Sequence, residues 1–198
     1  MKVAFVVFDG MTMLDLVGIY DCITRLKSMG FIPTLSWEIC ALSEDVSDDH
    51  GLRIASTWTA GSLEGFDILV VPGGLGTRKL QHDGDFTEWL QSGESASLKV
   101  SVCTGALLMG AAGFLTGRRA TTHPNAYVEL EPYCREVVRE RVVEDGNIIT
   151  ARGVTSSIDA GLYVVGHLEG EGVRVKIARQ MDYPYDWKAL GSSTAART

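Results

Sequence analysis

The sequence predicts an α/β protein whose mostly parallel sheet is sandwiched by helices. First, residues 3–8, 67–72 and 100–103 form largely apolar runs, which are typical of strands covered on both faces. Second, helical patterns separate these runs, and strands that alternate with helices build parallel sheets. Third, the run at 100–103 passes directly into an apolar helix at 106–112, so that only a tight turn at Cys103 joins the two elements.

The first half of the chain begins with the strand at 3–8, which ends in a turn at Asp9 and Gly10. A helix follows from Asp15, with apolar residues at helical spacing and Gly30 as its stop. The remaining elements expected here are a strand at 35–42, a polar loop at 43–51 whose acidic run forms a solvated turn, a short hairpin strand at 52–55, the strand at 67–72 and a surface helix around Phe86 and Leu90.

The second half contains the strand at 100–103 and the helix that follows Cys103. After it the sequence predicts an extended piece at 120–124, a helix at 125–133 that starts near Pro124, a hairpin of strands 141–144 and 148–151 around Asp145 and Gly146, and helices at 155–168 and 171–181. The order of these elements is that of one α/β domain.

Length and charge limit the domain organisation and the classes of partner. The 198 residues suit a single domain over residues 1–190, followed by a tail at 191–198 whose composition predicts disorder. The formal net charge is −7, and the Lys and Arg residues are scattered. We therefore expect neither nucleic acid nor a membrane as the main partner.

Cysteine usage and targeting patterns favour the cytoplasm. Cys22, Cys40, Cys103 and Cys134 lack close paired spacing, so neither a zinc site nor a disulfide framework is expected. The first apolar residues are too few for a signal peptide, and Thr and Gly residues interrupt the long apolar stretch at 100–116. Reduced thiols in the cytoplasm are the expectation that follows.

Cys103 is the candidate nucleophile. A strand that runs straight into a helix lifts the side chain at the turn out of the sheet and aims the first amides of the helix at the same point. The positive end of the helix dipole would favour the thiolate there. The alternative is a buried cysteine that packs as a small hydrophobic side chain.

The loops at the carboxyl ends of parallel strands share one crevice, and three of them carry polar groups. The amide of Gly74 or Leu75, in the loop that begins at Gly73, would hold a developing anion together with the amide of Thr104. The alternative for Gly73 and Gly74 is a turn that needs a positive φ. The Thr104 hydroxyl would either bind substrate or cap the helix.

Asp15 and His123 are the candidate proton-transfer groups. Asp15 lies between Leu14 and Leu16, so an apolar pocket would raise its pKa and let it exchange protons with the thiol. A plain helix N-cap explains Asp15 equally well. His123 closes a short extended piece and would suit acyl transfer beside Cys103, although a structural histidine fits the pattern too.

Several motifs occur together in the order found in the ThiJ/PfpI superfamily. They are Phe8-Asp9-Gly10, Leu14-Asp15-Leu16-Val17-Gly18, Val71-Pro72-Gly73-Gly74, Val102-Cys103-Thr104-Gly105, Ala120-Thr121-Thr122-His123 and Arg152-Gly153. The chain thus resembles this superfamily over residues 1–168, and its Asp15 and Thr104 are most similar to the isonitrile (isocyanide) hydratase branch. The superfamily resembles class I glutamine amidotransferases, which implies a flavodoxin-like sheet with a cysteine nucleophile elbow.

The resemblance implies a concrete activity. Cys103 would attack the terminal carbon of an isonitrile to give a thioimidate, Asp15 would manage the protons, and water would release an N-substituted formamide. No cofactor or metal would be needed, the substrate would be a small electrophile, and the protein would form a homodimer. Peptidases of the superfamily carry His after the cysteine, so Thr104 argues against a protease.

Two other functions use the same cysteine. In a glyoxalase or deglycase, the Cys103 thiol would add to a small aldehyde, with His123 or Asp15 moving protons. In a ligand-binding or redox-sensing module, Cys103 would be oxidised reversibly without turnover. Formation of a formamide distinguishes the hydratase from both.

Overall fold

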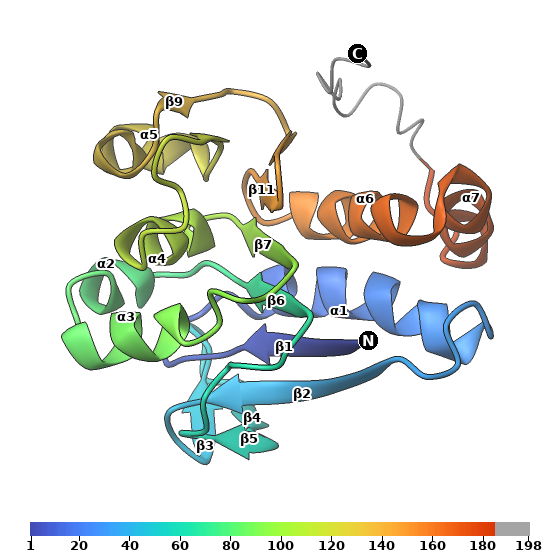
Figure 1. Cartoon of the computed structure of the whole chain (residues 1–198), viewed down its shortest axis with the longest axis horizontal. Helices are drawn as coiled ribbons and strands as arrows, with labels where there is room; N and C mark the ends of the chain where they lie inside the picture. The colour runs from blue at the N-terminus through green and yellow to red at the C-terminus, as the bar shows by residue number, and fades with distance from the viewer. Residues whose placement is uncertain (185–198) are drawn as a thin grey trace.

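The computed structural model describes residues 1–184 and confirms the α/β architecture (Figure 1). Seven strands of this part form one sheet in the order β10-β11-β7-β6-β1-β2-β5. They are β1 Lys2–Val6, β2 Ser36–Ala41, β5 Trp58–Thr59, β6 Ile68–Val71, β7 Leu98–Val102, β10 Val142–Asp145 and β11 Ile148–Ala151. All neighbours pair in parallel except β10 and β11, which form the predicted antiparallel hairpin.

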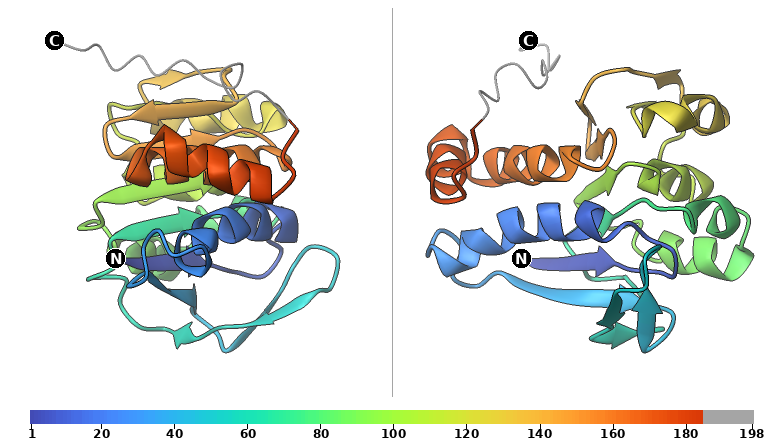
Figure 2. Two further views of the ribbon diagram at one scale, coloured as in Figure 1. Left: turned by 90° about the vertical axis from the view of Figure 1, so that its right-hand side faces the viewer. Right: turned by 180° about the vertical axis from the view of Figure 1, so that it is seen from behind.

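Helices cover both faces of this sheet, as the two further views show (Figure 2). One face carries α1 Met13–Ser28, α6 Ser156–Glu169 and α7 Glu171–Gln180. The other carries α2 Thr77–Leu80, α3 Gly84–Gln91, α4 Gly105–Ala111 and α5 Tyr127–Leu130. The residues of β1, β6 and β7 are buried almost throughout because helices lie on both sides of them.

Helices α1 and α6 pack closely because small residues lie between them. A Cβ atom added to Gly18 would come within 2.1 Å of Ser157 Oγ, and one added to Gly161 would come within 2.6 Å of Cys22 Cβ. Helix α1 buries Leu16, an apolar residue of the predicted helical pattern. This contact fixes the first turn of α1, which carries Asp15, relative to the sheet.

The structure corrects several predicted boundaries. The stretch 43–51 is not all loop, because β3 Asp45–Ser47 pairs antiparallel with β4 Arg53–Ala55 and buries Val46. The helix expected at 125–133 is broken into η1 Pro124–Ala126, α5 and η2 Glu131–Tyr133, since a proline at position 132 interrupts it.

Other elements carried no clear pattern in the sequence. The strands β8 Arg119–Ala120 and β9 Glu136–Val137 pair in parallel, and the helix α2 and strand β5 were not predicted. The predicted tail at 191–198 and the last six residues of the predicted domain lie outside the described part of the chain.

Within residues 1–184, no helix combines the length and the apolar character that crossing a membrane requires.

Candidate active site

Cys103 occupies a strained turn at the carboxyl end of β7. It is a non-glycine residue with a positive φ of 56°, and Thr104 separates it from the start of α4. Its backbone N–H donates to the carbonyls of Ala151 at 3.0 Å and Arg152 at 2.8 Å, while the Thr122 hydroxyl donates to its carbonyl at 2.8 Å. These bonds from two neighbouring segments hold the turn in the conformation of a nucleophile elbow.

Glycines let the loops after β6 and β7 pack directly against each other. A Cβ atom on Gly105 would lie 2.2 Å from the Val71 carbonyl oxygen. One on Gly73 would lie 2.5 Å from the Thr104 nitrogen and 2.8 Å from Cys103 Cβ. A side chain at either position would push the two loops apart, so the absence of Cβ atoms sets the geometry around the thiol.

Asp15 reaches this turn from the first turn of α1, where it is fully buried. Its Oδ2 accepts a hydrogen bond from the backbone N–H of Gly73 at 3.0 Å. Its Oδ1 is buried and has no hydrogen-bond partner of standard geometry among residues 1–184, which is rare and costly for a carboxylate oxygen. Thr12 is the N-cap residue, so the interpretation of Asp15 as a plain N-cap is wrong.

Burial raises the pKa of Asp15 from its ordinary value of 3.8 to about 7. The Gly73 amide and the Cys103 thiol oppose this effect through hydrogen bonds, and the negative charge of Asp49 adds to it. Asp49 accepts a hydrogen bond from the Thr12 hydroxyl at 3.1 Å, one residue before α1. Near neutral pH, Asp15 is therefore divided between its acid and carboxylate forms, as a proton-transfer group requires.

The pKa of the Cys103 thiol is raised from 9.0 to about 12, first by burial and then by the negative charge of Asp15. The amide and hydroxyl of Thr104 counteract this through hydrogen bonds to the sulfur. The expectation that the turn favours a free thiolate is thus wrong for the resting site. A raised pKa favours the protonated thiol, so any attack by the sulfur would need a neighbouring base to remove the proton.

The predicted anion-holding amides are partly occupied. The Gly73 N–H binds Asp15, and the Gly74 N–H donates to Thr104 Oγ1 at 3.0 Å while that hydroxyl donates back to the Gly74 carbonyl at 3.1 Å. The Leu75 N–H has no acceptor among residues 1–184, and its side chain is 72% exposed. Of the predicted amides, only that of Leu75 therefore lacks an acceptor among residues 1–184, since the Thr104 amide donates to the Cys103 sulfur.

His123 is less closely tied to Cys103 than Asp15 is. Its Nδ1 accepts a hydrogen bond from the Asn125 N–H at 3.2 Å, and the far edge of the ring lies against Gly153. Within the described residues no hydrogen bond joins His123 to Cys103. His50, His82 and His167 lie at the surface, as expected from the sequence.

Sequence reasoning assigned no role to Thr122, Arg152 or Asp49, although each acts on the pair of Asp15 and Cys103. The first two belong to motifs visible in the sequence, but nothing there shows that they hold the Cys103 backbone. Asp49 was interpreted as part of a solvated acidic run, and only the fold brings it close enough to raise the pKa of Asp15.

One group of side chains among residues 1–184 has the composition of a metal site. Ligand atoms of Asp48, Asp49 and His50 lie within 4.8 Å of one another. Asp48 Oδ1, however, accepts hydrogen bonds from the amides of His50 and Leu52 at 2.9 and 2.8 Å, and Asp49 Oδ1 lies 2.5 Å from His50 Nδ1. These bonds account for the arrangement as a stabilised turn.

Comparisons with known proteins show which family and which structures the chain is similar to. The sequence model of the DJ-1/PfpI family matches residues 1–167. An isonitrile hydratase from Pseudomonas putida is 34% identical over 192 residues, which cover 94% of this chain and 82% of that protein. Protein DJ-1alpha from Drosophila melanogaster is 27% identical over 181 residues, covering 89% and 74% of the two chains. The crystal structure of a ThiJ/PfpI family protein from Pseudomonas syringae superimposes with a TM-score of 0.83 at 32% identity, covering 93% of this chain and 76% of that one.

Proposed function

The chain belongs to the DJ-1/PfpI family, and from this membership and the pairing of Cys103 with Asp15 we propose that it hydrates isonitriles to N-substituted formamides. The observation that carries the proposal is a buried carboxyl group with a pKa of about 7 beside a protonated thiol. Such a pair supplies both the nucleophile and the proton that an isonitrile carbon needs. The similarity to a protein named isonitrile hydratase supports the same chemistry.

The first step uses the unpartnered oxygen of Asp15. In its carboxylate form, Oδ1 accepts the thiol proton while the Cys103 sulfur forms a bond to the terminal carbon of the isonitrile. Asp15 then passes that proton to the same carbon, which leaves a covalent thioimidate on Cys103. The Asp15 carboxylate is regenerated, so this step consumes only thiol and isonitrile.

The second step releases the product by hydrolysis. Water adds to the thioimidate carbon, the carbon–sulfur bond breaks, and the sulfur takes back a proton by way of Asp15. The other proton of the water ends on the nitrogen, which gives an N-substituted formamide. The Leu75 amide stabilises charge that develops on the reacting group, while the Thr104 amide stays on the Cys103 sulfur and the Thr104 hydroxyl fixes the Gly74 amide.

The test is steady-state turnover of a simple aryl isonitrile by the wild type and by Cys103→Ala, with the product identified by mass spectrometry. We expect formamide from the wild type and at least a 10³-fold lower rate from the variant, because no other nucleophile replaces the sulfur. Turnover that survives in Cys103→Ala would refute the role of Cys103. Absence of formamide with the folded wild type would refute the hydratase.

The same assay distinguishes the hydratase from the two alternative functions. A glyoxalase or deglycase would consume small aldehydes and produce no formamide from isonitriles. A redox sensor would oxidise readily at Cys103, yet oxidation requires thiolate character, and the raised pKa of this thiol disfavours it. The hydratase is favoured because attack on an isonitrile can be coupled to transfer of the same proton through Asp15.

We further propose that the protein acts as a homodimer. Leu14 and Val17 of α1 are 42% and 41% exposed, and they border a groove that also contains Ile158 and Met181. An apolar surface next to the Asp15 turn is suited to contact with a second copy. Light scattering on the wild type and on Val17→Lys tests this, since the charged variant should shift the population to monomer.

A further inference from the structure

A polar cavity lies at the amino end of β7, whereas Cys103 follows the carboxyl end of the same strand. Its volume is about 570 Å³, within the range of pockets that hold small molecules. The lining residues come from β7, from the ends of α3 and α4 and the segments that follow them, and from the start of β11; they include Gln91, Glu94, Lys99, Phe114, Arg118 and Asn147. Lys99 precedes Cys103 by four residues on an extended strand, so the two sites are about 13 Å apart.

Lys99 is the unusual residue of this cavity. It is only 4% exposed although lysine is almost never buried without a partner of opposite charge. Its ammonium donates to the Ala96 carbonyl at 2.8 Å and lies 5.2 Å from the centre of the Phe114 ring. No salt bridge to it is found among residues 1–184. An ammonium has three N–H donors, so part of its hydrogen-bonding capacity remains unused.

The burial of this amine has an electrostatic consequence. Loss of water around the ammonium lowers the pKa of Lys99, and the carboxylate of Glu94 opposes this effect. An anion placed in the cavity would restore the lost stabilisation of the charged amine. Among residues 1–184, Glu94 is thus a carboxylate that lines the same cavity but forms no salt bridge with the Lys99 ammonium.

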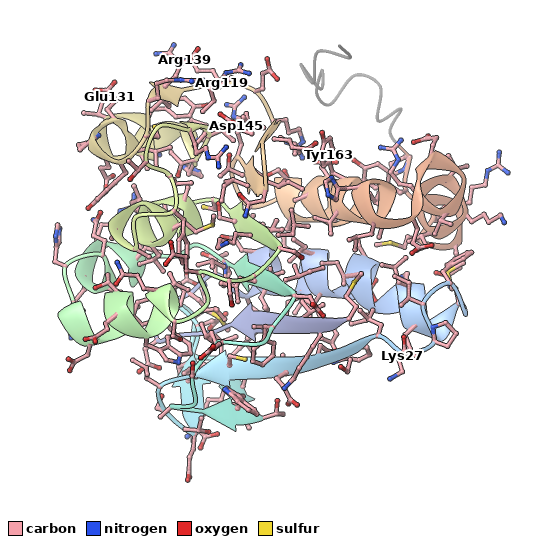
Figure 3. All side chains as sticks on the ribbon, viewed as in Figure 1. Lys27, Arg119, Glu131, Arg139, Asp145 and Tyr163 are labelled. Carbon is pink, nitrogen blue, oxygen red and sulfur yellow. The ribbon has the colours of Figure 1, made fainter. Side chains whose placement is uncertain are left out.

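Arg118 adds a second positive charge at the rim. Its Nη1 lies 3.5 Å from Asp145 Oδ1, which is a long ion pair. The same carboxylate accepts a hydrogen bond from the Arg119 N–H at 2.8 Å and lies 3.8 Å from Arg135. Figure 3 shows Arg119 and Asp145 close together in this region. One carboxylate shared among these groups leaves Arg118 able to pair with an additional anion.

We propose that this cavity binds a small organic anion, with its carboxylate or phosphate group on Lys99 and Arg118. The carbon skeleton lies against Phe114, and the amide side chains of Gln91 and Asn147 supply hydrogen bonds to polar substituents. Binding is independent of the chemistry at Cys103, because the two sites lie at opposite ends of β7.

A purely structural role of Lys99 predicts the opposite behaviour. If the ammonium only closed the turn through the Ala96 carbonyl, no anion would bind, and the cavity would hold only water. Titration of the wild-type protein with inorganic phosphate and, separately, with benzoate decides between the two. We expect saturable shifts of the backbone amide resonances of Asn147 and Ile148, and the two probes distinguish a phosphate ligand from a carboxylate ligand.

Two substitutions with opposite expected effects on the Kd of the anion sharpen the test. Lys99→Met removes the charge at similar volume and should raise the Kd of the bound probe at least tenfold, whereas Glu94→Gln removes a repulsive charge and should lower it about threefold. Lys176→Met is the matched control, because Lys176 is an exposed lysine over the ring of Phe31 at 5.8 Å, outside the residues that line the cavity. Arg118→Gln gives a second reading should Lys99→Met fail to fold, and it should raise the Kd at least threefold.

Three results would overturn the proposal. One is the absence of saturable shifts with either anion in the wild type. Another is an unchanged Kd in both Lys99→Met and Arg118→Gln. The third is equal weakening by Lys176→Met, which would show that the anions respond to overall charge rather than to this cavity.

Discussion

Strand β7 has a buried ionisable group at each end, and the two groups differ in how tightly their surroundings are packed. At the carboxyl end, the Cys103 backbone has a φ of 56° and packs against Gly73 so tightly that no Cβ atom fits there. At the amino end, Lys99 has ordinary strand pairing with Leu69 and Ile148 and faces an open cavity of about 570 Å³. One strand thus ends in a closed, strained site and begins at a relaxed, open one.

This difference matches the two roles that we propose for these sites. Covalent chemistry requires the sulfur and the carboxyl group to be held within a fraction of an ångström, and close packing provides that precision at a cost in strain. Reversible binding of an anion requires accessible charge and room for water to leave. The partners agree with this division, since Asp15 interacts with the Cys103 thiol, whereas the Lys99 ammonium interacts with the Ala96 carbonyl and the Phe114 ring.

The largest expected effect concerns the stability of the closed site. Native Asp15 keeps its proton up to pH 7, whereas the unfolded carboxyl group loses it above 3.8, so the native state binds more protons in between. The free energy of unfolding should therefore fall as the pH rises from 4 to 7, with a contribution of about 4 kcal/mol that is fully lost above pH 7.

Urea denaturation of the wild type and Asp15→Asn at several pH values measures this contribution, because other titrating groups cancel in the difference. Asp21→Asn is the control, since Asp21 lies on the same helix but is exposed and paired with Arg25 at 2.7 Å. A pH-independent difference between wild type and Asp15→Asn would contradict a raised pKa for Asp15.

The next largest effect is on turnover. Asp15→Asn should lower the rate of formamide production by about 10²-fold or more, because the amide cannot carry the thiol proton to the isonitrile carbon. In the wild type, kcat should rise with pH through about 7 as the Asp15 carboxylate forms. Pre-steady-state and steady-state rates with an aryl isonitrile test both points, and a flat pH profile together with an unaffected variant would remove Asp15 from the mechanism.

A smaller effect, on the stability of the fold, is expected from a change in packing at the carboxyl end of β7. Gly73→Ala places a Cβ atom where the Thr104 backbone lies and should destabilise the fold by about 2 kcal/mol, with slower turnover as the loops separate. Gly84→Ala is the matched control, since a Cβ there meets nothing within 4 Å. Thermal and urea denaturation compare the two variants, and equal stability would show that the loops after β6 and β7 adjust freely.

The smallest effect is expected at the open end. Lys99→Met should change the free energy of unfolding by less than about 1 kcal/mol, since the lost hydrogen bond to Ala96 is offset by removal of a buried charge. Turnover should remain within about twofold of the wild type. A large loss of either quantity would show that the two ends of β7 are coupled rather than separate.

Much of the fold was predictable because apolar runs, helical spacing and turn residues all indicate the same elements. Apolar runs became β1, β6 and β7, and the Asp145-Gly146 pair formed the expected hairpin between β10 and β11. The prediction of a loop at 43–51 was wrong in part, because the strand there buries only one apolar residue, Val46, among acidic residues. A single apolar residue does not form the alternating pattern that indicates a strand. The predicted helix at 125–133 is not continuous because a proline at position 132 cannot continue an α-helix.

The sequence predicted the turn at Cys103 and the apolar surroundings of Asp15, but not the hydrogen bonds and charges around these two residues. The turn from strand to helix marked Cys103, and the apolar neighbours of Asp15 indicated a raised pKa. The protonated thiol, the occupied Gly73 and Gly74 amides and the influence of Asp49 depend on contacts between segments distant in sequence.

By itself, then, the sequence determined the alternation of strands and helices, the turn at Cys103 and the apolar neighbours of Asp15, because these depend on local periodicity and on residue type. Only the tertiary structure decided that Asp15 lies against Cys103, how the pKa values of both shift, and where the polar cavity forms, since a pKa depends on burial and on every neighbouring charge. The Lys99 cavity is the clearest case: its walls come from α3, α4, β7 and β11, and no single stretch of sequence contains them.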